Sequence, residues 1–408
     1  MSRPAREGDR IVLPGLATAH SHAFQRALRG RTQRRDSGSA SFWSWRGLMY
    51  ELAGKLDPDS IYSISKFAYT ELAMAGVTAV GEFHYVHHQP DGTPYDDRTI
   101  LAEAVIRAAR DVGIRIALLR VVYNRAGDGR APEGVQRRFC DDSLDDALAD
   151  VDLLSARFVD DQFVSVGIAP HSVRAVPRPW LAKAASFARE REMPFHMHVA
   201  EQRRELEECI AEHGAPPVRM LAEDGVLDHR FVAVHATHLE ADEVAALGAA
   251  KAFVCICRTT ERDLGDGLCD AAALVGAGAR LCTGVDSHAI SDPFEEARSI
   301  ELDDRSRSEA RHVVANADVL FDAASTTGYD AIGHGGRHTA DRVVLDATDP
   351  ALVGADDALL TDHVIFAATP RSVVEVCVGD DTIVEGGVHR DYDSIRVTYE
   401  RVLGQLTR

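Results

Sequence analysis

Several side chains at the ends of apolar runs have the types that bind a metal ion and move protons. His20 and His22 end the first such run, with a single residue between them. Alternate residues of a strand point to the same face, so both imidazoles can reach one cation. An isolated pair of this kind is equally consistent with two hydrogen-bonded histidines at a rim. The assignment therefore depends on further ligands.

Two later runs supply those ligands. His198 ends the fifth run, in HMHVAE, and Asp286 ends the eighth, in GVDSH. His196 has the same parity as His198 but lies one pleat deeper, so we assign it to the core. Three imidazoles and one carboxylate suit one divalent ion, with Zn²⁺ expected and Fe²⁺ as the alternative, and leave an open position for water. Such an ion lowers the pKa of bound water and generates hydroxide as a nucleophile.

A second metal bridged by a carbamylated lysine is not expected. The four lysines all fall outside the ends of the apolar runs: Lys55, Lys66, Lys183 and Lys251.

The remaining chemistry is proton transfer. Asp286 can accept a proton from the attacking water, and Glu201, three residues after His198, can pass one to a leaving nitrogen. His235, in VHATH, can polarise the attacked group. Taken alone, Glu201 is also typical of a solvated carboxylate at a helix start, and His235 of a rim histidine. Their conjunction with the ligand set favours catalysis.

Eight β-rich runs from residue 11 to about 290 alternate with stretches of helical spacing, which predicts a (β/α)₈ barrel over residues 15–335. A doubly wound open sheet gives the same alternation but spreads the strand ends along an edge. In a barrel the strand ends form one catalytic face. That face should gather His20, His22, Tyr85, His171, His198, Glu201, His235 and Asp286.

The alternation of β-rich runs and helical stretches ends after residue 335. RVVLDATDP, HVIFAAT and VVEVCVGDDTIVEGG read as short strands. We therefore expect a small β-rich domain made of residues 1–14 and 336–408. Only residues 1–14 remain to contribute from the N-terminal side, so we expect the domain to be shortened there.

Composition limits the partners. A net charge of −19 with no compensating basic stretch argues against nucleic acid and anionic membranes. No run of eighteen apolar residues and no secretory signal occurs, and the seven cysteines form no CxxC pair. We expect a cytoplasmic protein with reduced cysteines. An anionic substrate would need arginines of its own.

The motifs HxH, HxxE, HATH and GxDSH, in this order, resemble the mononuclear deaminase branch of the amidohydrolase superfamily. HSHAFQRA, FWSWR and EFHYVHH are more particular and resemble the formimidoylglutamate deiminase family over residues 11–330. The resemblance implies hydrolysis of N-formimino-L-glutamate to N-formyl-L-glutamate and ammonia, a step of histidine degradation, by a homodimer. It also implies a set of residues around the glutamate portion: Gln25, Arg46, Tyr85, His171 and Arg174.

Some residues depart from that pattern. Arg258 follows Cys257 where Pro or Ser is expected, Asp263 replaces Asn, and Val285 replaces Ser. We expect all three to border the active face, where Arg258 could attract a carboxylate and Asp263 could weaken that attraction. A shifted specificity within the family is the consequence to test.

Other assignments stay open. Arg46 could instead pack against Trp43 or Trp45. We expect His288 to support Asp286. His84, His87 and His88 cluster after the second apolar run, and we expect them to lie in a solvated loop. Two rival functions remain: a deaminase of the same superfamily acting on a purine or another aminated heterocycle, and a degenerate barrel without catalysis.

Overall fold

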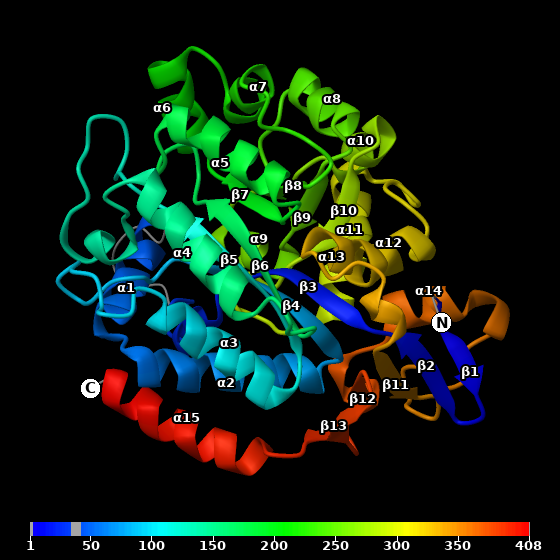
Figure 1. The fold of residues 1–408 in the computed structure, drawn as a ribbon. Helices are drawn as coiled ribbons and strands as arrows, with labels where there is room; N and C mark the ends of the chain where they lie inside the picture. Colours follow the sequence, from blue (N-terminus) through cyan, green and yellow to red (C-terminus); the bar gives the residue numbers. More distant parts are fainter. Residues whose placement is uncertain (1–2, 34–41, 408) are drawn as a thin grey trace.

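The chain forms an eight-stranded parallel barrel with a smaller antiparallel sheet at its side, as the computed structural model shows for residues 3–33 and 42–407 (Figure 1). The predicted (β/α)₈ barrel is confirmed. Its strands follow one another in chain order: β3 (Leu16–Ser21), β4 (Val77–His84), β5 (Arg115–Val122), β6 (Val164–Pro170), β7 (Phe195–Val199), β8 (Phe231–His235), β9 (Phe253–Ile256) and β10 (Arg280–Thr283).

The first and last strands meet at the mouth of the barrel. The backbone N–H of Asp286 donates to the carbonyl of His20 at 3.1 Å, and the N–H of His22 donates to the carbonyl of Asp286 at 2.9 Å. These bonds bring the end of β10 beside the end of β3. Residues far apart in the sequence therefore share one end of the sheet.

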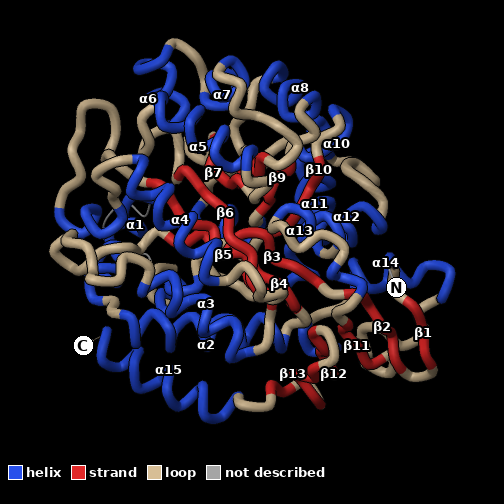
Figure 2. Tube along the Cα trace, viewed as in Figure 1, coloured by secondary structure: helices blue, strands red, loops and turns tan. Residues whose placement is uncertain are grey.

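Helices cover the outside of the barrel (Figure 2). The helices between the barrel strands and after them are α1 (Phe42–Lys55), α2 (Pro58–Met74), α3 (Ile100–Val112), α4 (Leu144–Arg157), α5 (Arg178–Glu190), α6 (Arg203–His213), α7 (Pro217–Glu223), α8 (Ala241–Ala249), α9 (Arg258–Leu264), α10 (Ala271–Ala277), α11 (Pro293–Ser308), α12 (Ala317–Ala324) and α13 (Thr326–Ala331). Two of them lie near the mouth, because α1 lines the pocket there and the first residues of α9 are buried. In α3, Leu101, Val105 and Val112 share the buried face, and Gly113 ends the helix at φ +94°.

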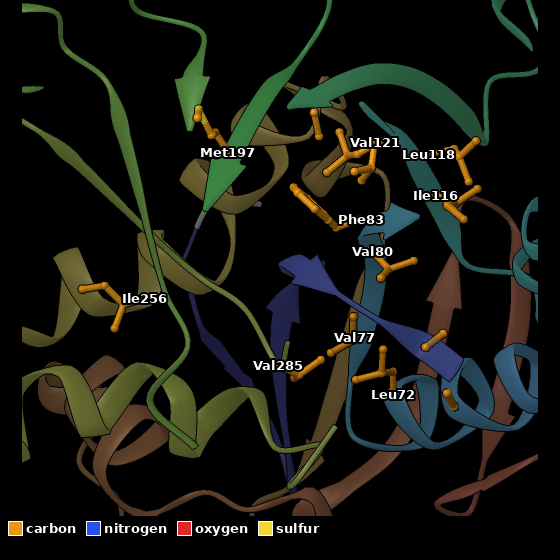
Figure 3. Packing of buried hydrophobic residues seen from close by; sticks show 14 of the residues in the cluster. Leu72, Val77, Val80, Phe83, Ile116, Leu118, Val121, Met197, Ile256 and Val285 are labelled. Atoms are coloured by element: carbon orange, nitrogen blue, oxygen red, sulfur yellow. The ribbon is translucent and has the colours of Figure 1, made fainter. Parts of the chain in front are cut away.

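Apolar residues of the strands and inner helix faces form one large core. Figure 3 shows part of it, where Val80 and Phe83 of β4 lie near Ile116 of β5. Burial of these side chains supplies the main driving force for closing the barrel.

The first apolar run is divided between the two sheets. β2 (Arg10–Pro14) belongs to the small sheet, and the barrel strand begins at Leu16. Gly15 lies between them, and a Cβ there would lie 2.5 Å from the hydroxyl of Tyr329 and 2.7 Å from that of Thr78. Only glycine fits this close passage.

The small sheet pairs both ends of the chain. Its order is β1 (Ala5–Glu7), β2, β11 (Arg342–Asp346), β12 (Val373–Val378), β13 (Asp381–Glu385) and β14 (Val388–His389), all antiparallel. It lies beside the N-terminus in Figure 1.

The prediction of one strand after residue 335 is wrong. The stretch HVIFAAT lies mostly in the helix α14 (Leu360–Ala367), whose buried residues Leu360, Val364 and Ile365 follow helical spacing. Short apolar runs do not distinguish a strand from a buried helix.

The last helix, α15 (Tyr392–Leu406), runs along α2 (Figure 1), and the rings of Tyr399 and Phe67 stack at 4.1 Å. Within residues 3–33 and 42–407, no helix has the length and apolar character needed to cross a membrane.

Candidate active site

The four predicted metal ligands lie together at the mouth of the barrel. The Nε2 atoms of His198 and His20 are 3.1 Å apart. Asp286 Oδ1 lies 3.2 Å from His22 Nε2 and 3.5 Å from His20 Nε2. All four side chains are almost completely buried. They come from the ends of β3, β7 and β10, as the strand-end argument predicts.

The donor set fits a divalent cation. Nδ1 of His22 donates to the carbonyl of Phe83 at 2.9 Å, and Nδ1 of His198 donates to that of His171 at 3.0 Å. These bonds fix the neutral tautomer of each ring in which Nδ1 carries the proton and Nε2 carries a free lone pair. Acceptor atoms of His22 and His198 therefore face the carboxylate of Asp286 and the ring of His20, an arrangement that a bound cation would stabilise.

The charge states agree with this interpretation. Burial lowers the pKa of His20 to about 3 and also lowers the pKa values of His22 and His198, so the rings are neutral. Burial alone would raise the pKa of Asp286, but its side-chain contact with His20 outweighs burial and holds that pKa well below its usual value. The site thus offers one anion and three neutral nitrogens to a metal.

Strained backbone surrounds the site. Asp286, His235 and Ala200 have φ values of +48°, +70° and +53°, in the left-handed region that non-glycine residues rarely adopt. Each follows or ends a barrel strand. Strain of this kind persists where the surrounding structure fixes it, and it is typical of functional sites.

A buried carboxylate supports the first strand from behind. Glu82 accepts from the hydroxyl of Ser21 at 2.6 Å and from the backbone N–H of Ala23 at 2.8 Å. His288 Nε2 contacts the same Ser21 hydroxyl at 2.9 Å. The expectation that His288 supports Asp286 directly is therefore corrected, because its side chain instead holds the residue between the two ligands of β3.

Glu201 and His235 face the same centre. His235 Nε2 lies 4.0 Å from Glu201 Oε1 and 3.9 Å from Asp286 Oδ2. Burial raises the pKa of Glu201 above its usual value, which makes this carboxylate a better proton acceptor. Burial would lower the pKa of His235, but the nearby carboxylates, Glu201 first, outweigh it and raise that pKa.

Sequence reasoning missed Glu261, which holds the other side of His235. Its Oε1 lies 3.4 Å from His235 Nδ1 and accepts from the backbone N–H of Cys257 at 3.0 Å. Glu261 is 1% exposed. The sequence signal that could have indicated Glu261 is its position, one turn into the helix that follows the seventh barrel strand.

One pocket joins the centre to the predicted substrate residues. Its wall includes all five residues that the resemblance implied: Gln25, Arg46, Tyr85, His171 and Arg174. Glu201, His235 and Asp286 lie at its inner end.

Each arginine of the pocket meets a phenol. Arg46 Nε donates to the hydroxyl of Tyr50 at 2.7 Å, with its guanidinium 4.9 Å from that ring centre. Arg174 Nη1 lies 3.4 Å from the hydroxyl of Tyr123. Tyr50 and Tyr123 both line the pocket and were missed from the sequence. The alternative contact of Arg46 with Trp43 involves a side chain outside the described residues.

Gln25 and Tyr85 form a second polar pair. Gln25 Nε2 donates to the Tyr85 hydroxyl at 2.8 Å. The other amide atom, Gln25 Oε1, is buried and has no hydrogen-bond partner in the described part of the chain. It remains available to accept from an N–H group of a ligand.

The three departures from the family pattern do not line this pocket. Arg258 is completely buried and donates to Glu261 at 3.1 Å, so its expected attraction for a substrate carboxylate is wrong. Asp263 accepts from Gln33 at 2.9 Å on the surface. Val285 is buried in the core.

The three histidines after the second barrel strand were expected in a solvated loop, and this is also wrong. His84, His87 and His88 are at least 94% buried. His87 Nε2 bonds the carbonyl of Val121, and His88 Nε2 bonds that of Cys140, each at 2.9 Å. They tie the loop after β4 to its neighbours. His196 is also a core residue, because its Nε2 bonds the carbonyl of Ala331 at 2.9 Å.

Comparison with known proteins now identifies the family. A model of the amidohydrolase family matches residues 11–383. The chain belongs to the amidohydrolase family. A curated relative, formimidoylglutamate deiminase of Pseudomonas aeruginosa, is 38% identical over 97% of this chain and 89% of its own length. Membership of the amidohydrolase family and this relative make the chain an enzyme, a hydrolase of carbon–nitrogen bonds.

Two further similarities extend the family assignment. The crystal structure of an amidohydrolase from Brucella melitensis is 33% identical, with a TM-score of 0.90 over 99% of this chain and 96% of that one. A 5-methylthioadenosine/S-adenosylhomocysteine deaminase of Haloquadratum walsbyi is 25% identical over 90% of this chain and 78% of its own length. Relatives named as deaminases of different substrates thus resemble this chain.

Proposed function

We propose that the enzyme hydrolyses N-formimino-L-glutamate to N-formyl-L-glutamate and ammonia, a step of histidine degradation. The observation that carries this proposal is the presence of Arg46 and Arg174 in one pocket with the histidine–aspartate centre. A substrate with two carboxylates needs two such donors. A purine base has no carboxylate that either arginine could bind.

The polar wall of the pocket supports binding of the glutamate portion. Although burial would raise its pKa, the positive charges of Arg174 and Arg46 lower the pKa of Tyr123. Two cationic side chains thus lie close together at one part of the pocket wall, in a chain of net charge −19. An anionic substrate is attracted to this wall, while its formimino head extends towards Glu201.

The residues at the inner end perform the proton transfers. His20, His22, His198 and Asp286 would hold a divalent metal, which would supply a water-derived nucleophile at neutral pH. Asp286 accepts a proton during attack on the formimino carbon. Glu201 would relay this proton, and then the second proton of the same water as the tetrahedral adduct collapses, to the formimino nitrogen, so that the C–N bond breaks and ammonia leaves while the carbon becomes the N-formyl group. Burial raises the pKa of Glu201, which favours this relay. His235 stabilises the negative charge that develops opposite it.

Zn²⁺ is the metal we propose for this site. Three imidazole nitrogens and one carboxylate are ligands that Zn²⁺ accepts, and they leave one position open. Metal analysis of the purified protein tests this directly, since about one equivalent of zinc is expected. A predominance of iron would replace zinc without changing the ligand set.

One assay separates the proposed substrate from its rival. Ammonia release is measured with N-formimino-L-glutamate, guanine, 8-oxoguanine, cytosine and 5′-methylthioadenosine under the same conditions. We expect turnover of N-formimino-L-glutamate alone. Release of ammonia only from a base would reject the substrate and support a heterocycle deaminase.

A further inference from the structure

A buried ion pair lies behind the catalytic histidine. Arg258 begins α9, is completely buried, and donates from Nη1 to Glu261 Oε2 at 3.1 Å. The other oxygen of the same carboxylate, Oε1, faces His235 Nδ1 at 3.4 Å and the backbone N–H of Cys257 at 3.0 Å. The two oxygens of Glu261 thus serve different partners.

Arg258 is itself held from the opposite side. Its Nε lies 3.7 Å from Asp303 Oδ2, and its Nη2 lies 3.7 Å from Asp304 Oδ2, both on α11. Nη2 also contacts Cys269 Sγ at 3.7 Å. A guanidinium with donors in a rigid plane can bridge such partners without rotating. The position of Glu261 is therefore linked through Arg258 to the outer helix α11.

Fixing Glu261 has a consequence for His235. The backbone of His235 is strained, with φ +70°, a conformation that persists only where surrounding contacts fix the residue. A bond to Nδ1 fixes the orientation of the ring and aims Nε2 at the pocket. If the carboxylate of Glu261 rotated, the ring would lose that partner.

We propose that Arg258 is a positioning residue for catalysis, acting through Glu261 to hold His235 towards the reacting group. This inference rests on the proposed function for its kinetic test. It assigns a role to a residue that departs from the family pattern. Arg258 does not touch the substrate, because it lies outside the pocket wall.

Three variants test the role: Arg258→Gln, Arg258→Lys and the matched control Arg262→Gln. Arg262 lies one turn later on α9, is partly exposed and pairs with Asp303 at 2.6 Å, but it does not contact Glu261 through its side chain. We expect Arg258→Gln to lower kcat about 10- to 100-fold, the usual effect of removing such a supporting group, with KM changed less than about twofold. Arg258→Lys keeps the charge but not the planar set of donors, so its kcat should lie between those of Arg258→Gln and wild type, and Arg262→Gln should leave kcat unchanged.

A spectroscopic measurement separates positioning from general damage. In protein labelled with ¹⁵N-histidine, the Nδ1–H resonance of His235, assigned with His235→Asn, should shift or broaden in Arg258→Gln and not in Arg262→Gln. Unchanged kcat together with an unchanged resonance in folded Arg258→Gln would overturn the proposal. If wild type does not act on N-formimino-L-glutamate, the proposed function fails while the resonance still decides the role of Arg258.

A second route covers a folding defect. Should Arg258→Gln not fold, Glu261→Gln removes the charge that Arg258 contacts but keeps an oxygen for His235 and Cys257. We expect a kcat loss of about tenfold and a displaced His235 resonance, with metal content unchanged. Wild-type values for both would reject the ion pair as a positioning device.

Discussion

The mouth and the base of the barrel both contain buried charges, but they are arranged oppositely. At the base, Arg115 of β5 donates to both oxygens of Asp341 at 2.7 and 2.8 Å, and Tyr329 donates to the same carboxylate at 2.6 Å. Every group there faces its complement. At the mouth, imidazole lone pairs face each other and Asp286.

This difference separates stability from function. The base network joins the barrel to the small sheet, because Gly379 between β12 and β13 also donates to Asp341 at 2.9 Å. Paired groups of this kind stabilise the fold without a ligand. The imidazole and carboxylate groups at the mouth are arranged to bind a metal and a substrate. Without those ligands they lack complementary partners, so the fold must hold them in an unfavourable arrangement. Substitutions at the two ends should therefore have opposite effects.

The largest effect is expected for Asp286→Asn. Loss of the only anionic ligand should reduce bound metal below about one tenth of an equivalent and lower kcat/KM by at least about 10²- to 10³-fold. Elemental analysis and ammonia release measure both effects. The matched control, Asp341→Asn, should retain metal. Full metal content in Asp286→Asn would contradict the proposed ligand set.

Arg115→Met should give the opposite result. It leaves Asp341 buried without its cation, which costs about 3–5 kcal/mol of unfolding free energy. Chemical unfolding measures this loss, and kcat at 25 °C should stay within about twofold of wild type. A fall in kcat without a change in stability would remove the distinction between the two ends.

The two arginines of the pocket test the substrate assignment within the mouth. Arg174→Met and Arg46→Met should each raise KM about 10- to 100-fold, the loss of a charge-assisted hydrogen bond, while metal content stays unchanged. Steady-state kinetics give both values. Arg26→Met is the control, since Arg26 pairs with Glu71 outside the pocket. Unchanged KM in both pocket variants would reject binding of carboxylates at these arginines.

The sequence could predict the mouth because strand position and parity are local properties. His20, His22, His198, Glu201, His235 and Asp286 each lie at or just after a strand end, and parallel strands bring those ends together. No contact between distant segments had to be known. The same reasoning assigned His196 to the core.

Interactions between distant segments could not be predicted in this way. Ser21 is linked to Glu82 and His288, which are 61 and 267 residues away. Arg258 could be seen as unusual, but its burial against α11 depends on packing that no local pattern encodes. Tyr50 required knowing that α1 forms one wall of the pocket. The helix α14 was mistaken for a strand because its apolar run is short.

The smallest effect concerns a carboxylate at the mouth that has no cation bonded to it in the described part of the chain. Glu205 accepts from the N–H groups of Ala200 and Glu201 at 3.2 and 3.3 Å. Burial, with a contribution from the charge of Glu201, raises its pKa to about 7 from 4.5. The folded state therefore binds more protons than the unfolded state between these pH values.

This raised pKa sets the sign of a pH effect. The stabilisation from the protonated form is fully present below about pH 4.5 and is lost as pH rises through about 7, by up to about 3 kcal/mol. Glu205→Gln, which stays neutral, should lose less stability than wild type between pH 5 and 8. Chemical unfolding of metal-loaded protein at several pH values measures the difference, with Glu208→Gln on the same helix as control. Parallel pH profiles for wild type and Glu205→Gln would mean that the folded protein stabilises the Glu205 carboxylate as well as water does. The mouth would then carry less electrostatic strain than its contrast with the base implies.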